Sequence, residues 1–281
     1  FTIDGVSRSF EVYNRRTDPS ELNLGDYIIE TTGAGLRFGY PISEFERISF
    51  GAGYEGTDLE VGPFSPDRFQ RYVDDFGNSS YAVLLNAGYS FDSRDSAIAP
   101  TRGRVTRLTA EYATPLGDQE FIRTTYQEQF YFPIGKLYTL ALNGEITGGF
   151  GLGDSPYPIF RNVYAGGIGT VRGYRSSTLG PRDADNVPIG GSKRVIANAE
   201  FFFPIPGMSK DRTFRAFTFL DAGNVFQTNE KIKFGELRYS TGVGISWLSP
   251  VGPLKFSLGV PLNREPQDET QRVQFTIGTG F

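Results

Sequence analysis

The chain has 281 residues, no cysteine and no histidine, and its 32 acidic residues slightly outnumber its 28 basic ones. This composition excludes disulfides, thiolate metal sites, a cysteine nucleophile and a Ser-His-Asp triad. The charges are dispersed along the chain, so they indicate no nucleic-acid-binding face.

Apolar residues recur at every second position in about twelve segments, a period that predicts β-strands. Each segment is about ten residues long, which is the length a tilted strand needs to cross a bilayer. One short helix is expected at Asp67–Phe76, inside a long connection. The predicted strands cover residues 5–14, 31–41, 46–56, 80–92, 103–113, 121–132, 136–148, 194–203, 214–225, 237–248, 253–262 and 272–281.

The face opposite the apolar one is built from small and charged residues, which suits a wet lumen better than the surface of a soluble sandwich. PISEFE, TPLGDQE, FPIGK and LSPVGP are short turns, whereas 56–79, 149–193 and 226–236 are long, and we expect the two kinds at opposite rims. The prediction is an all-β fold, a transmembrane antiparallel β-barrel of about twelve strands that forms one domain over residues 1–281. A soluble β-sandwich or solenoid is the alternative. The small residues on the inner face include Gly33, Gly35, Gly39, Gly51, Gly53, Gly242 and Gly244.

Alternation places two carboxylates on the inner face of neighbouring strands. Glu200 lies on the strand 194–203, and Asp221 lies on the strand 214–225. A shielded carboxylate needs a partner, and Arg172 of the long loop 149–193 would supply a bidentate one if the loop folds into the lumen. The alternative is a solvated arginine in an external loop. The glycines that would let the loop turn are Gly166, Gly167, Gly169 and Gly173.

Other chemistry is not indicated by any motif. DADN (Asp183–Asn186) lacks the glycine and the final glutamate of a calcium loop. GGIGTVRG has the wrong spacing for a dinucleotide loop, and no βαβ unit surrounds it. We therefore expect no catalytic residue, no metal site and no cofactor, and a protein that is not an enzyme.

The stretch GTVRGYRSSTLGP, preceded by FRNVYAGG, resembles the VRGF/Y loop motif of the Omp85 family, in particular its BamA-type branch. AEFFFPIP, FLDAGNVF and the terminal QFTIGTGF fit the same family, so the resemblance covers essentially the whole chain. It implies that the loop lies in the lumen and that its arginine contacts acidic residues of the wall. The matching loop positions are Val171, Arg172, Gly173 and Tyr174, and the acidic positions are Glu200 and Asp221; the family more often has Phe where this chain has Tyr174.

The resemblance also implies a function, which is assembly and insertion of outer-membrane β-barrel proteins at a weak seam between the first and last strands. The implied partners are outer-membrane lipid, unfolded β-barrel clients and accessory Bam lipoproteins bound through POTRA domains, and the implied location is the bacterial outer membrane. The alternatives are a sibling that transports polypeptides, of two-partner secretion or TamA-like type, and a passive porin-type channel. The expected seam residues are Phe275, Ile277, Gly278, Gly280 and Phe281, although glycines are also common where strands end at a barrel rim.

The start of the chain departs from the family pattern. Family barrels have sixteen strands preceded by POTRA domains, whereas this sequence begins some four strands late and contains no POTRA sequence. It also starts at Phe1 without an initiator methionine, so we expect a processed product or an excised piece. An even strand count permits closure as a smaller, twelve-stranded barrel, and the sequence does not decide between the two.

Overall fold

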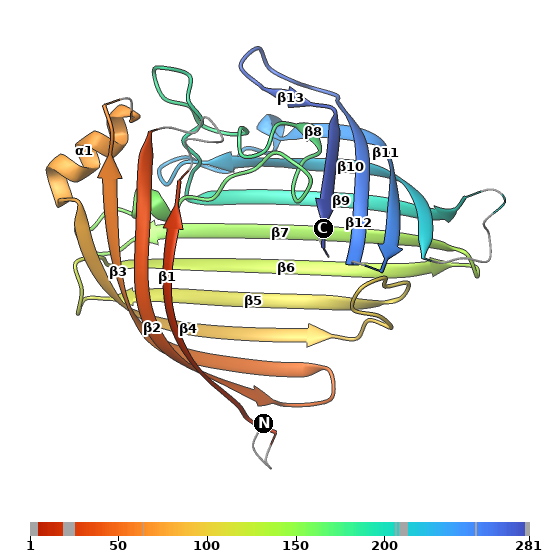
Figure 1. Ribbon diagram of the computed structural model, residues 1–281, viewed down its shortest axis with the longest axis horizontal. Coiled ribbons are helices and arrows are strands. Elements are labelled where there is room, and N and C mark those ends of the chain that lie inside the picture. The colour runs from red at the N-terminus through yellow and green to blue at the C-terminus, as the bar shows by residue number, and fades with distance from the viewer. Residues whose placement is uncertain are drawn as a thin grey trace.

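The computed structural model describes residues 5–18, 26–63, 65–205, 207, 213–250 and 252–278. Within them one antiparallel sheet of twelve strands curves strongly around a central space (Figure 1). All twelve predicted strands are present, and the helix forms at the expected residues as α1 (Asp67–Phe76). The strands of the sheet are β1 (Ser7–Thr17), β2 (Tyr27–Pro41), β3 (Glu46–Val61), β4 (Ser79–Asp92), β5 (Gly103–Thr114), β6 (Phe121–Ile134), β7 (Tyr138–Gly151), β9 (Lys193–Pro204), β10 (Phe214–Phe226), β11 (Arg238–Ser249), β12 (Gly252–Pro261) and β14 (Val273–Ile277).

The two faces of the sheet differ in the way the alternation predicts. Apolar side chains on the convex face stay exposed, because in the described residues the protein itself does not cover them; Leu36, Phe50, Ile146 and Val243 are 53%, 55%, 51% and 53% exposed. The concave face carries polar side chains such as Asn143. This is the arrangement of a transmembrane antiparallel β-barrel, with its apolar band toward lipid.

Because neighbouring strands run in opposite directions, successive connections alternate between two rims. The rim that carries α1 and residues 152–192 also carries the short turn 115–120 between β5 and β6. The prediction that all short turns share the opposite rim was therefore wrong for TPLGDQE. That opposite rim has the short turns 42–45 and 135–137, but also the longer connection 93–102.

The sheet keeps two edges in the described part of the chain. The order runs from β1 to β14, and no backbone pairing between these two strands is found among the described residues. The two predicted seam residues Gly280 and Phe281 lie outside those residues. Closure at twelve strands, which the sequence left open, is therefore not seen among the described residues.

The connection between β7 and β9 fills part of the space enclosed by the sheet. It contains the one-turn helix η2 (Ile159–Arg161) and the two-residue strand β8 (Gly173–Tyr174). β8 pairs with another short strand, β13 (Thr270–Gln271), from the connection between β12 and β14. Another one-turn helix, η3 (Phe234–Glu236), lies between β10 and β11.

Apolar residues of the loop and the wall form a buried cluster, each no more than 3% exposed: Ala165, Val171, Tyr174, Leu179, Ile196 and Val225. No helix in the described ranges is long and apolar enough to cross a membrane.

Candidate functional site

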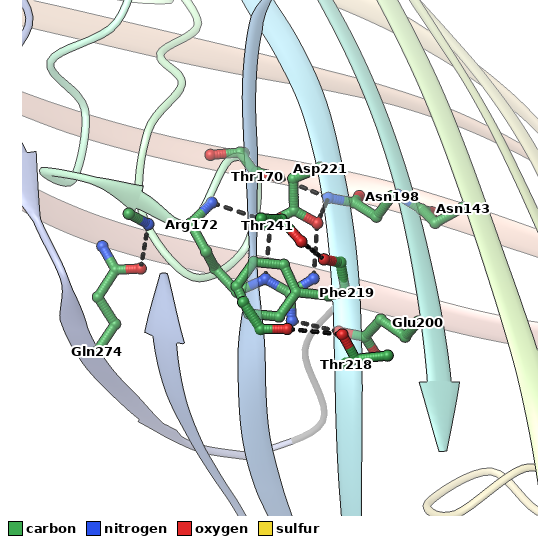
Figure 2. Close-up of polar contacts among 12 residues, drawn as sticks. Asn143, Thr170, Arg172, Asn198, Glu200, Thr218, Phe219, Asp221, Thr241 and Gln274 are labelled. Carbon is green, nitrogen blue, oxygen red and sulfur yellow. Dashed lines mark hydrogen bonds and ion pairs between the residues drawn. The ribbon is translucent and has the colours of Figure 1, made fainter. Parts of the chain in front are cut away.

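Arg172 lies inside the sheet, against the wall formed by β9 and β10. Its side chain donates to both oxygens of Asp221, from Nε to Oδ2 at 2.7 Å and from Nη2 to Oδ1 at 2.6 Å. Its Nη1 donates to Oε1 of Glu200, and its backbone N–H donates to Asp221 Oδ2 at 3.0 Å. The arginine is 3% exposed, and the two acids are 1% and 0% exposed. Figure 2 shows the guanidinium held between the two carboxylates.

A second cation completes this cluster. Lys255, on β12, donates from Nζ to both oxygens of Glu200 at 2.8 Å. Two cations and two anions therefore balance in a buried site, which is the condition under which buried charges are tolerated. Burial alone would lower the pKa of Arg172, but Glu200 and the hydrogen bonds to Asp221 raise it above its ordinary value. The arginine is therefore charged, and it is paired with both acids.

Asp221 also joins a row of amides that crosses the wall. Asn198 Nδ2 donates to Asp221 Oδ1 at 2.9 Å and to the carbonyl of Thr170 at 2.6 Å. Asn143 Nδ2 donates in turn to Asn198 Oδ1 at 2.9 Å. These wall residues stand directly opposite one another across β7, β9 and β10, so strand register alone aligns the row.

Two aromatic rings lie beside the guanidinium on the same wall. The centre of the Phe219 ring is 3.7 Å from Arg172 Cζ, and that of Phe217 is 5.7 Å away. Both rings fit because β11 has glycines opposite them: a Cβ on Gly242 would lie 2.7 Å from the Phe219 ring, and one on Gly244 would lie 2.3 Å from the Phe217 ring. These two glycines make room for the rings that contact Arg172, which is a more specific reason for small residues than a wide lumen.

The neighbours of Arg172 attach the loop to the last three strands of the sheet, β11, β12 and β14. Gly173 has φ +84 and packs against Gly259 of β12, where a Cβ added to Gly173 would lie 3.1 Å from the Gly259 carbonyl carbon. Tyr174 is fully buried, and its hydroxyl donates to the carbonyl of Tyr239 at 3.3 Å. On β14, Gln274 accepts from the Gly173 N–H at 3.3 Å and donates to the Tyr174 carbonyl at 2.7 Å.

The structure thus brings five of the predicted site residues together: Arg172, Gly173, Tyr174, Glu200 and Asp221. Val171 is buried in the neighbouring apolar cluster. Two of the predicted seam residues, Phe275 and Ile277, lie apart from the ion cluster, because they point to the convex face and are 73% and 68% exposed. Gly278 follows β14 with φ +120.

The site residues that were not predicted include Lys255, Phe219 and Gln274. The signal for Lys255 was available, since two lumenal acids and one arginine leave a negative charge, and Lys255 is on the inner face of its strand. Alternation assigns a face but not a height along the barrel, so it does not tell which inner residues meet. In the described ranges no group of three or more acidic side chains is arranged to hold a metal ion.

Comparison with known proteins agrees with this geometry. The Omp85 superfamily domain matches residues 1–281. The chain is 36% identical to the outer membrane protein assembly factor BamA of Neisseria meningitidis serogroup B, over 100% of this chain and 40% of that protein. It is 27% identical to BamA of Nitratidesulfovibrio vulgaris, over 95% of this chain and 35% of the relative.

A solved structure has the same fold. The crystal structure of BamA from Haemophilus ducreyi lacking POTRA domains 1-3 superimposes with a TM-score of 0.90 at 24% identity, covering 98% of this chain and 59% of that one. The chain therefore spans less than two thirds of each protein that it resembles here.

Proposed function

This chain belongs to the Omp85 superfamily, and on that premise we propose that it forms the membrane barrel of a BamA-type outer-membrane protein assembly factor. It is an integral β-barrel of the outer membrane. Its clients are unfolded β-barrel proteins, which insert into the surrounding lipid beside it. Accessory lipoproteins belong to the same proposal and act through domains outside this chain.

The observation that carries the proposal is the contrast between the sheet's interior and its last strand. β2 and β3 pair over fifteen residues, whereas β12 and β14 pair over five in the described part of the chain. A strand at an edge presents unpaired N–H and C=O groups to which another extended chain can add. A client strand would gain backbone hydrogen bonds at this edge while its outward side chains meet lipid.

The buried loop supports an assembly role over a passive channel. A loop that is fixed in the lumen by Arg172, Glu200 and Asp221 obstructs solute flow through the space it occupies. The same contacts stiffen the wall around β9 and β10, so movement is left to the less paired last strand, β14. No nucleotide is required, because the folding free energy of the client drives its insertion.

A liposome experiment with three readouts tests the proposal. The protein that carries this barrel is reconstituted, an unfolded outer-membrane barrel protein is added outside, and folding is followed by heat-modifiable gel mobility. We expect faster folding than in empty liposomes, without transfer of an unrelated polypeptide into the lumen and without steady ion conductance. Polypeptide transfer without faster folding would favour the secretion transporter, and steady conductance alone would favour the channel.

A further inference from the structure

A second arginine of the long loop reaches a different part of the wall. Arg161, the last residue of η2, forms an ion pair with Glu55 of β3 through Nη2 and lies 3.6 Å from Glu111 of β5 through Nη1. Its side chain is 15% exposed, and that of Glu55 is 8% exposed. Arg172 binds β9 and β10, so the loop is held to two separate stretches of the sheet.

The position of Arg161 is fixed from its own side as well. Tyr157 donates its hydroxyl to the Arg161 carbonyl at 3.1 Å and packs edge-on against Phe121, with ring centres 5.7 Å apart. The guanidinium lies over the same Phe121 ring, 5.4 Å from its centre. A cation held by a ring and two carboxylates in a shielded site is a built contact rather than a solvated side chain.

Glu55 contacts the first strand of the sheet through its other carboxylate oxygen, Oε2. Tyr13 of β1 donates its hydroxyl to Glu55 Oε2 at 2.6 Å. Tyr13 faces Gly33 of β2, and Gly33 faces Glu55 of β3, so the three residues form one row across three strands. The tyrosine reaches across β2 only because Gly33 has no side chain: a Cβ there would lie 2.6 Å from the ring.

The other end of the loop contacts β14. Gln274 of β14 is 6% exposed and bonds to the backbone of Gly173 and Tyr174. One loop thus contacts two distant strands of the sheet, β14 directly and β1 through Glu55. Both contacts are made by side chains on the lumenal face.

We propose that the loop between β7 and β9 is a tie across the lumen that links β1 to β14, and that Arg161 is the positioning residue for β1, acting through Glu55 and Tyr13. This inference rests on the proposed function for its role, because the tie restrains the last strand, to which a client strand would add. Release of either contact loosens one of these two strands while the sheet interior and the Arg172 cluster stay intact.

Amide hydrogen exchange of the membrane-reconstituted protein tests the tie. Tyr13→Phe removes one hydroxyl and keeps the ring, and we expect exchange in Ser7–Thr17 to become about tenfold faster, the size of one hydrogen bond to a charged group. Arg161→Gln does not touch β1, yet it should also speed exchange there. Adding it to Tyr13→Phe should bring no further increase. Gln274→Met should speed exchange in Val273–Ile277 instead.

Thr125→Val is the matched control, since it removes a hydroxyl contact to Thr147 on the same lumenal face of β6 and β7 and should leave β1 unchanged. The proposal is wrong if Arg161→Gln leaves the rate of amide exchange in β1 unchanged. It is also wrong if the rate increase in the double variant is the product of the increases in the two single variants. If wild-type protein speeds client folding but Tyr13→Phe alters no exchange in β1, the tie is wrong and the function stands. If Tyr13→Phe and Arg161→Gln each speed exchange in β1, if the double variant shows no further increase, and if the wild type does not speed client folding, the tie stands and the proposed function is wrong.

Discussion

Reversal of the charge at Arg172 is the most direct perturbation of the lumenal cluster. Arg172 forms a group of zero net charge with Lys255, Glu200 and Asp221, and Arg172→Glu changes that net charge to −2. The side chains of the arginine and of the two acids are each at most 3% exposed. Removing one partner of a buried ion pair costs about 3–5 kcal/mol, because the remaining charge is left uncompensated. At about 1.4 kcal/mol per factor of ten, the open form of the loop becomes at least about 100 times more populated.

Trypsin cleavage after Arg182 measures this opening, because its side chain is only 8% exposed while the loop is in place. We expect Arg172→Glu to be cut at least about 100-fold faster than wild type under conditions where cleavage follows the open population. Arg175→Glu is the matched control three residues away. It disrupts a pair with Glu269 in which both side chains are about 40% exposed, so it should change the rate by less than about fivefold.

A paired substitution separates charge from shape. Arg172→Gln alone leaves Asp221 with an uncompensated charge, whereas Arg172→Gln with Asp221→Asn places two neutral amides side by side. The double variant should therefore be cut more slowly than the single one. Cleavage of Arg172→Glu at the wild-type rate, in a barrel that still shows folded gel mobility, would refute the account of the loop anchor.

Further predictions concern other contacts of the fold. Gly173→Ala should destabilise the docked loop by about 1–3 kcal/mol, seen as faster cleavage after Arg182, because φ is +84 and Gly259 is close; Gly235→Ala, where a Cβ meets nothing within 4 Å, should not. Lys255→Met should lower thermal stability less than Arg172→Met does. Without Lys255, Glu200 is still paired with Arg172, and Asp221 loses no partner. Burial raises the pKa of Asp95, but hydrogen bonds from Thr101 and Arg102 hold it below the ordinary value. The stabilisation by ionised Asp95 is therefore present above its ordinary pKa of about 3.9 and is lost as the pH falls through the lowered pKa. Pepsin should cut the connection 93–102 faster at about pH 2 than at about pH 4. Asp95→Asn should reduce this difference.

The sequence predicted the strands well because lipid outside and polar residues inside impose alternation on every strand. It gave β2 a start at residue 31 and β3 an end at residue 56, whereas the structure extends them to Tyr27 and Val61. These extensions lie at the rim, where the apolar alternation fades but backbone pairing continues. The pairing of β8 with β13 was not predicted, since two-residue strands carry no period.

The site was predictable only in part for a related reason. Alternation placed Glu200 and Asp221 on the inner face, but it left the docking of Arg172 between them as one of two alternatives, and the family resemblance favoured it. The partners Lys255, Gln274 and Arg161 were missed because their contacts join residues 55, 100 and 106 positions apart, at heights set by barrel stagger. A single sequence records which face a residue occupies and not which residue it meets there.

The row formed by Tyr13, Gly33 and Glu55 also distinguishes correct from incorrect pairing while the first strands assemble. A slip of β1 by one residue would turn the Tyr13 hydroxyl into lipid. A slip by two would set Tyr13 opposite Gly35, whose neighbour on β3 is Gly53, or opposite Thr31, whose neighbour is Thr57. Neither offers a carboxylate, so of these registers only the native one gives the hydroxyl an ionised acceptor, and β1, β2 and β3 contain their own test of alignment.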